Sequence, residues 1–184
     1  MEGWWYEGAG LYRHVWLGDY APVSIATDGV HGDPRKGASG WHVPVTATLT
    51  SIVETDSPVT VEARLLDPQG KVVAQGQAKA TVPALDEGQA VLDLPVADPQ
   101  LWSVERPNLY TLDVRLLRDG QVADERRVPI GFRTIRFDAA NGFFLNDRPV
   151  KLKGVCLHQD HAGVGTAIPD ALLGWRLERL KAMG

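Results

Sequence analysis

Residues 43–49 read VPVTATL and residues 59–65 read VTVEARL. In both runs every second side chain is apolar, so an extended backbone would place the apolar side chains together on one face. This period of two is typical of a β-strand that buries one face and exposes the other. The two runs therefore predict strands of an all-β domain.

The same alternation recurs on both sides of these runs. Further strands are predicted from apolar positions with this spacing, at Leu92, Leu94 and Val96, at Leu112, Val114 and Leu116, and in residues 122–133. Asp67-Pro68-Gln69-Gly70 has the proline and glycine of a type I turn, and Asp119-Gly120 is favoured in two-residue hairpins. About seven short strands over roughly ninety residues favour an immunoglobulin-like antiparallel β-sandwich over a barrel or a propeller.

The residues before the sandwich divide into two stretches. Residues 1–27 are rich in aromatic side chains and include the alternating run Leu11–Leu17, which predicts a strand. Residues 28–40 are dominated by Gly, Asp, Pro, Lys and Ser, which is typical of a linker or an entry loop. We therefore expect one isolated strand and a linker in front of the sandwich domain, which we place at residues 41–133.

The residues after the sandwich predict a β/α unit. Two short strands joined by Asn141-Gly142 precede an apolar strand, Val150–Leu157. A glycine-rich loop follows, and a helix is predicted from Pro169 to a C-cap glycine at Gly184. Such a unit is normally repeated, because its strand needs parallel neighbours and its helix needs a sheet to cover.

The composition excludes several classes of function. The 184 residues are 44% hydrophobic and 23% charged, and the net charge of -4 leaves no basic stripe for nucleic acid. No segment approaches the ~20 apolar residues needed to cross a bilayer, so we expect no membrane partner. Cys156 is the only cysteine, which rules out an internal disulfide. Nucleophile-elbow, phosphate-loop and complete dinucleotide motifs are also absent, and the cellular compartment stays open.

Three groups of motifs resemble the family-2 glycoside hydrolases, the β-galactosidase group, and they occur in the order that this family requires. They are WYEGAGLYRHVWL at Trp5–Leu17, LWSVERPNLY at Leu101–Tyr110, and a third group made of GFRTIR at Gly131–Arg136, GFFLN at Gly142–Asn146 and KGVCLHQD at Lys153–Asp160. The match covers essentially the full length of the chain. It departs from the family pattern at Val104, where a proline is common, and at Asp147, where a glycine is common.

The resemblance implies that the chain is an internal fragment with four parts. Residues 1–27 would be the C-terminal strand region of a sugar-binding jelly roll, 28–40 a linker, 41–133 the immunoglobulin-like sandwich, and 134–184 the start of a TIM-barrel catalytic domain. The expected fold class is therefore mainly β: an antiparallel sandwich followed by one β/α unit of an incomplete barrel. A complete barrel needs eight such units.

The resemblance also implies a glycosidase that hydrolyses O-glycosidic bonds, with β-galactosides favoured over β-glucuronides and β-mannosides. Retaining glycosidases use two carboxylic acids about 5–5.5 Å apart, one as proton donor and one as nucleophile. In this family both are glutamates on later barrel strands, the acid/base following an asparagine, and no Asn-Glu pair occurs here. We therefore expect no catalytic residue and no cofactor in this chain, and a carbohydrate substrate for the parent protein.

His158 and Asp160 are the candidate substrate-binding residues. The predicted strand Val150–Leu157 would present His158 at its C-terminal end, where barrel enzymes gather their active sites, and the resemblance implies that His158 lines the sugar pocket. Asp160 would orient His158 or bind sugar hydroxyls. The alternatives are a strand-end histidine with a backbone partner and a turn-forming aspartate.

Other residues invite a functional interpretation with a structural alternative. Four neighbouring side chains could ligate zinc: Cys156, His158, Asp160 and His161. Zinc sites need fixed geometry and usually a distant second pair of ligands, so we expect no metal and a simple loop role for His161. Tyr12 and Arg13 resemble positions near the barrel mouth, although a Tyr-Arg pair on an aromatic strand is more often an amphipathic surface. Trp102 is predicted to be a structural anchor.

Two hypotheses of function remain open. In the first, the chain is a non-catalytic scaffold within a glycosidase. In the alternative, it is a stand-alone immunoglobulin-like binding or spacer module, which would account for residues 41–133 alone. A lone β/α unit exposes both a sheet edge and an apolar helix face, which predicts self-association of the isolated chain.

Overall fold

The computed structural model describes residues 10–158 and 160–184. The chain divides into two compact units. Residues 19–152 form the larger unit, and the smaller unit combines the segment up to Gly18 with residues 153–184. The strands of the described residues lie in the larger unit, and the helix α1 lies in the smaller one.

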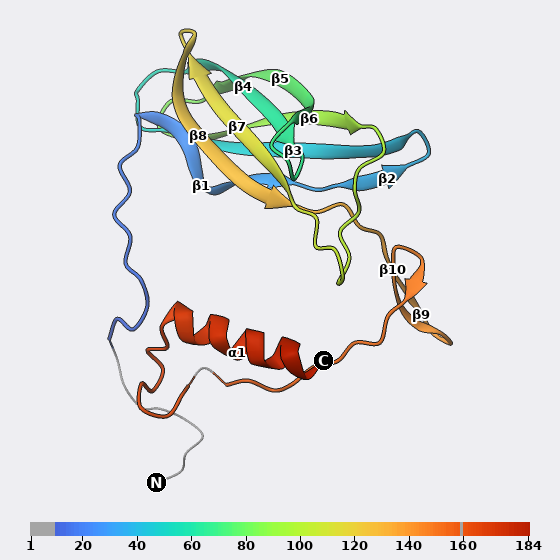
Figure 1. Ribbon diagram of the computed structural model, residues 1–184. Helices are drawn as coiled ribbons and strands as arrows, with labels where there is room; N and C mark the ends of the chain where they lie inside the picture. The colour runs from blue at the N-terminus through green and yellow to red at the C-terminus, as the bar shows by residue number, and fades with distance from the viewer. Residues whose placement is uncertain (1–9, 159) are drawn as a thin grey trace. The chain divides into compact units, whose positions relative to one another are not determined.

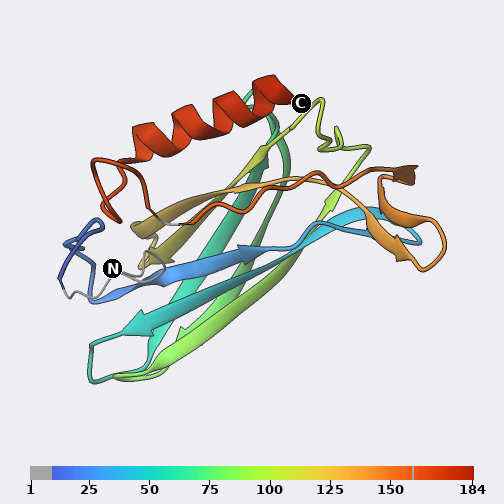
Figure 2. The same ribbon diagram turned by 90° about the horizontal axis from the view of Figure 1, so that it is seen from below.

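Two antiparallel sheets form a sandwich in the larger unit. One sheet contains β1 (Val23–Gly32), β3 (Gly40–Ser51) and β6 (Glu87–Val96), with the short strand β2 (Arg35–Gly37) also paired to β3. The other has the order β5 (Val72–Val82), β4 (Ser57–Leu66), β7 (Tyr110–Arg118), β8 (Gln121–Ile130). Figures 1 and 2 show these two layers from perpendicular directions. The arrangement confirms the predicted immunoglobulin-like sandwich.

The core lies between the two sheets and is made of the alternating apolar residues. Three strands supply its centre with fully buried side chains: Val43, Val45, Ala47 and Leu49 from β3, Val61, Ala63 and Leu65 from β4, and Leu112, Val114 and Leu116 from β7. Phe132 adds a buried ring whose centroid lies 5.5 Å from that of Trp41 and 4.9 Å from that of Tyr110. Burying one such side chain contributes roughly 1.5–3 kcal/mol, so this core dominates the stability of the unit.

The two predicted turns are confirmed, and each has a clear local cause. The Asp67 carboxylate accepts hydrogen bonds from the backbone N–H groups of Gln69 and Lys71, both at 2.9 Å. Asp119 and Gly120 have φ angles of 52° and 76°, the left-handed backbone that a two-residue hairpin between β7 and β8 requires.

The interpretation of residues 28–40 as a linker is wrong. Strand β1 continues to Gly32 and β2 lies entirely within this stretch, and both pair with β3. The pairing of β1 shifts register between Ile25 and Val30, where Asp28 has a φ of 54°. A Cβ atom on Gly29 would lie 2.8 Å from the Thr48 carbonyl oxygen, so this glycine allows a close backbone approach at a bulge.

Two other predicted strands are not formed. The runs Leu11–Leu17 and Val150–Leu157 lack strand pairing, and the side chains of Leu11 and Leu17 are 87% and 101% exposed. Alternation indicates which face a strand would bury, but a strand forms only where another strand accepts its backbone hydrogen bonds. The described residues offer neither run such a partner.

The hairpin and the helix after the sandwich are confirmed. Strands β9 (Ile135–Asp138), β10 (Gly142–Leu145) and β11 (Arg148–Pro149) form a small antiparallel sheet. Helix α1 (Asp170–Met183) begins after Pro169 and ends at Gly184, whose φ is 85°. No helix of the described residues is long and apolar enough to span a membrane.

The outer face of the second sheet carries a buried carboxylate. Asp113 points away from the core, since its neighbours in β7 point inward, yet it is only 1% exposed. It forms an ion pair with Arg64 of β4, and lies 3.7 Å from Arg127 of β8 and 3.9 Å from Arg115. A buried carboxylate is tolerated only when it is paired, so these charges favour the observed register of β4, β7 and β8.

We predict that Asp113→Ala lowers the free energy of unfolding by about 2 kcal/mol, because it leaves the partly buried Arg64 guanidinium without its acceptor, whereas Arg115 and Arg127 keep Glu125. Asp93→Ala is the matched control. It removes an ion pair with His42 in which the Asp93 side chain is 57% exposed, and such surface pairs contribute about 0–1 kcal/mol. Urea unfolding measures both variants, and equal losses would contradict this role for Asp113.

The stability of the turn between β9 and β10 is predicted to depend on pH. Backbone N–H groups of Asn141 and Ala140 hold the pKa of the Asp138 carboxyl below its ordinary value of 3.8, with help from the Asn141 side chain and Arg136. Because the pKa of Asp138 is lower in the folded protein than in the unfolded chain, its ionised carboxylate stabilises the fold above pH 3.8. This stabilisation is lost as the pH falls through the pKa of the folded protein. The amide resonance of Asn141 should titrate with a midpoint below 3.8, and Asp138→Ala should abolish this titration. A midpoint at or above 3.8 would contradict the prediction.

Candidate functional site

The candidate residues lie on the chain that leads into α1 (Figure 1). His158 is exposed at the end of the extended segment, and Asp160 is half-buried at the start of the next loop. We call residues 160–168 the pre-helix loop. Its centre is a tight turn, because the His161 N–H donates to Gly165 O at 3.0 Å and the Gly165 N–H donates back to His161 O at 2.9 Å. Gly163 and Gly165 have φ angles of 88° and 58°, which explains the glycines there.

Arg176 of α1 holds the start of the pre-helix loop. Its Nη2 donates to the Asp160 carbonyl oxygen at 2.8 Å and also to Nδ1 of His161. A guanidinium can only donate, so His161 Nδ1 must be the accepting nitrogen and the ring proton of the neutral histidine lies on Nε2. The structure thus brings Asp160 and His161 together on Arg176, a residue that the sequence analysis did not single out.

The N-terminal segment holds the other end of the loop. Arg13 Nη1 donates to the carbonyl oxygen of Ile168 at 3.2 Å and lies 3.7 Å from the Asp170 carboxylate. His14 Nε2 lies 3.2 Å from the same carboxylate. Asp170 is in the first turn of α1, where a negative charge is favoured by the helix dipole. Tyr12, which the sequence analysis considered together with Arg13, is 54% exposed.

The donor set around the pre-helix loop suits hydrogen bonding to a polar ligand. Imidazole, carboxylate and guanidinium groups are the side chains that bind hydroxyl-rich molecules through charge-assisted hydrogen bonds. Cys156 is exposed. Residues 10–158 and 160–184 contain no group of three His, Cys, Asp or Glu side chains that could hold a metal ion.

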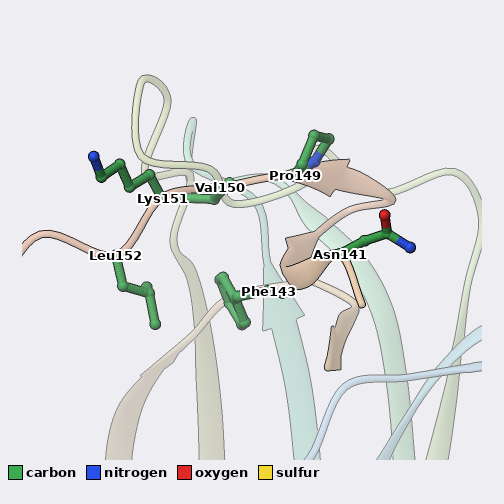
Figure 3. A pocket seen from close by; sticks show the side chains of 7 residues that line it. Asn141, Phe143, Pro149, Val150, Lys151 and Leu152 are labelled. Atoms are coloured by element: carbon green, nitrogen blue, oxygen red, sulfur yellow. The ribbon is translucent and has the colours of Figure 1, made fainter. Parts of the chain in front are cut away.

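A separate pocket lies on the larger unit, beside the small sheet of β9, β10 and β11. It has a volume of about 560 Å³ and is lined by Asn141, Gly142, Phe143, Pro149, Val150, Lys151 and Leu152. In Figure 3 the Phe143 and Leu152 side chains lie on one side of the segment 149–152, and Lys151 extends away from them. The Phe143 ring packs on Phe137 with centroids 5.2 Å apart. The lining residues include no carboxylate and no histidine, and Lys151 is their one ionisable side chain.

Three of the quoted motifs meet at one junction in the larger unit. The Trp102 N–H donates to Phe132 O at 2.8 Å, and Arg133 lies over the indole ring, 5.3 Å from its centroid. The side-chain amide of Asn146 donates to Trp102 O and accepts from Thr134 N, both at 3.0 Å. Asn146 therefore connects the small sheet to the loop that carries Trp102. The contacts of Trp102 agree with its predicted role as a structural anchor.

Comparisons with known proteins agree with these motifs. The family model for Glycosyl hydrolases family 2 matches residues 28–133. The β-galactosidase BoGH2A from Bacteroides ovatus is 34% identical to this chain over 181 residues, which cover 98% of this chain and 21% of that protein. A β-glucuronidase from Bacteroides fragilis is 34% identical over 168 residues, covering 86% of this chain and 24% of that protein. The chain thus spans about a fifth of the length of the curated relatives that it matches.

Solved structures give the same result. A glycosyl hydrolase family 2 member from Bacteroides cellulosilyticus matches with a TM-score of 0.90 and 34% identity, covering 100% of this chain and 26% of that chain. A β-glycosidase from Bacteroides vulgatus matches with a TM-score of 0.75 and 34% identity, covering 97% of this chain and 22% of that chain.

We predict that Asn146→Ala destabilises the junction by about 2 kcal/mol, because it removes two hydrogen bonds and places alanine at a φ of 49°. Asn146→Gly loses the same bonds without the backbone strain, so its loss should be smaller. Asn141→Ala, in the neighbouring turn, is the matched control. Thermal unfolding measures all three, and an unchanged midpoint for both Asn146 variants would contradict the assigned role.

Proposed function

This chain belongs to family 2 of the glycosyl hydrolases, and we propose that it is a non-catalytic scaffold within a retaining glycosidase. The observation that carries the proposal is the match of nearly the whole chain to relatives whose names include both β-galactosidase and β-glucuronidase. The relatives are several times longer than this chain, and the proposal places the hydrolytic groups in the remainder of such a protein.

The proposed layout assigns a place to each part of the chain. Residues 1–22 correspond to the end of a jelly roll, of which residues 1–9 lie outside the described residues. Residues 23–133 are the sandwich, because β1 and β2 pair with β3, and 134–184 begin the catalytic barrel. Support comes from α1, in which none of the described residues is buried, and from the exposed apolar side chains of Leu152, Val155 and Leu157. A first barrel strand and helix would have these surfaces covered by further β/α units.

The proposed chemistry leaves binding rather than bond cleavage to this chain. A retaining glycosidase needs one carboxylic acid to protonate the leaving oxygen and a second carboxylate to attack the sugar carbon. The sequence holds no Asn-Glu pair to supply the acid/base. His158 and Asp160 would instead bind sugar hydroxyls, His158 from the exposed end of the extended segment and Asp160 from the pre-helix loop that Arg176 holds.

The proposed substrate is a β-galactoside, with β-glucuronides and β-mannosides as the less favoured classes. The stretch Gly154–Asp160 is similar to the galactosidase branch of the family, and BoGH2A carries that name. The β-glucuronidase from Bacteroides fragilis has the same identity to this chain, so the sugar is decided by residues outside it.

A second candidate function is that of an independent sandwich module. The observation in its favour is that residues 19–152 form a compact unit with its own buried core. It gives no role to the pre-helix loop or to α1, whereas the glycosidase proposal does.

We predict that the 184-residue chain does not hydrolyse nitrophenyl β-galactoside, β-glucuronide or β-mannoside, whereas a protein extended through a complete barrel hydrolyses at least the galactoside. In the extended protein, Asp160→Asn should raise KM for the galactoside about tenfold through the loss of a charge-assisted hydrogen bond. Asp147→Asn, in a surface turn, is the matched control and should leave KM unchanged.

Two outcomes would contradict the proposal. Hydrolysis by the short chain would mean that the catalytic acids lie within it. Inactivity of the extended protein on all three substrates would favour the sandwich-module function.

A further inference from the structure

Two arginines from distant parts of the sequence hold the two ends of the pre-helix loop. Arg176 binds its first residues, through Asp160 O and His161 Nδ1, and Arg13 binds near its last, through Ile168 O. Arg13 and Ile168 are 155 residues apart in the chain. Both arginines bind backbone carbonyl groups, and Arg176 also binds the His161 side chain, so together they fix the path of the loop.

The loop depends on such support because its centre is a short turn that contains two glycines. Its internal backbone bonds join His161 to Val164 and Gly165, and Ala162, Gly163, Val164 and Ala167 are exposed. Gly163 and Gly165 are free to adopt other backbone angles at little cost. Hydrogen bonds from a charged donor are roughly twice as strong as neutral ones, so two guanidinium groups restrict this loop considerably.

Arg13 is itself held in place. Its guanidinium lies 3.7 Å from Asp170, and His14 lies 3.2 Å from the other oxygen of that carboxylate. The Ile168 side chain beside this contact is 5% exposed. The exposed ion pairs contribute little energy by themselves, but they orient Arg13 toward the Ile168 carbonyl.

We propose that Arg13 and Arg176 are positioning residues that together fix the pre-helix loop and thereby place Asp160 for substrate binding. They act through the loop and do not touch the substrate. This role rests on the glycosidase function proposed above. It also makes the segment around Arg13 a part of the binding site, although that segment precedes the sandwich in the sequence.

The first test follows the loop itself and needs no activity. In the 184-residue chain, amide hydrogen exchange at Val164 and Gly165 reports whether the turn at His161 stays closed. Arg13→Met and Arg176→Met should each accelerate this exchange about tenfold, since each removes a charge-assisted hydrogen bond. Arg179→Met, on the same helix with its guanidinium over the Trp175 ring, is the matched control and should not.

A spectroscopic signature separates the role of Arg176 from a general loss of packing. Imidazole nitrogen resonances of the wild-type chain should show His161 protonated on Nε2 and accepting on Nδ1. Arg176→Lys keeps a donor and should retain this tautomer, whereas Arg176→Met should give a mixture. Exchange rates and tautomer equal to those of Arg179→Met in both methionine variants would overturn the proposal.

The second test uses the protein extended through the complete barrel. Arg13→Met should raise KM about tenfold and leave kcat within about twofold, and Arg13→Lys should restore part of the loss. A raised loop exchange with an unchanged KM would overturn the positioning role. If the extended protein hydrolyses no glycoside, the glycosidase function fails, while the exchange measurement still decides whether the two arginines hold the loop.

Discussion

Burial of alternate side chains between two antiparallel sheets is the interaction on which the rest of this structure depends. Strand β3 pairs with β1 on one side and β6 on the other, and its apolar residues from Val43 to Leu49 have no exposed surface. A shift of one residue in this pairing would turn the whole apolar set toward water, so the register is strongly specified. In the second sheet, the buried Asp113 and its arginines favour the register of β4, β7 and β8 from the face opposite the core.

The functional parts of the chain depend on polar backbone contacts rather than on apolar burial. Asn146 joins the small sheet to the Trp102 loop through two hydrogen bonds, and Arg13 and Arg176 hold the pre-helix loop through carbonyl groups. Such contacts fix the path of the backbone. This combination suits the scaffold role proposed above.

The elements that the sequence predicted are those whose hydrogen-bond partners lie within this chain. Strands β3, β4, β6, β7 and β8, both turns, the β9–β10 hairpin and α1 follow from local patterns, because their hydrogen-bond partners lie nearby or are selected by the shared core. Strand β5 was not assigned from the sequence. Strand β1 was missed because Asp28 and Gly29 indicate a bulge as readily as a linker. The alternating run Leu11–Leu17 and the apolar run Val150–Leu157 have the composition of strands but are not assigned to a strand in the described residues.

The candidate site was predictable only in part. His158 and Asp160 were found through the family resemblance, and their binding role stays a prediction. Arg13 and Arg176 could not have been assigned to one loop from the sequence, because their acceptors are backbone carbonyl groups 155 and 16 residues away. Every residue has a backbone carbonyl group, so the sequence does not indicate which one accepts a hydrogen bond from an arginine. The fold identifies the acceptor.

The central claim is that the sandwich is a self-sufficient unit and that the loop and helix after it are supported by a few polar contacts. Native-state hydrogen exchange along the 184-residue chain tests this most directly. The account predicts that amides of β3, β4 and β7 exchange only through global unfolding, while those of the pre-helix loop and α1 exchange through local opening. Equal protection of α1 and β3 would contradict it.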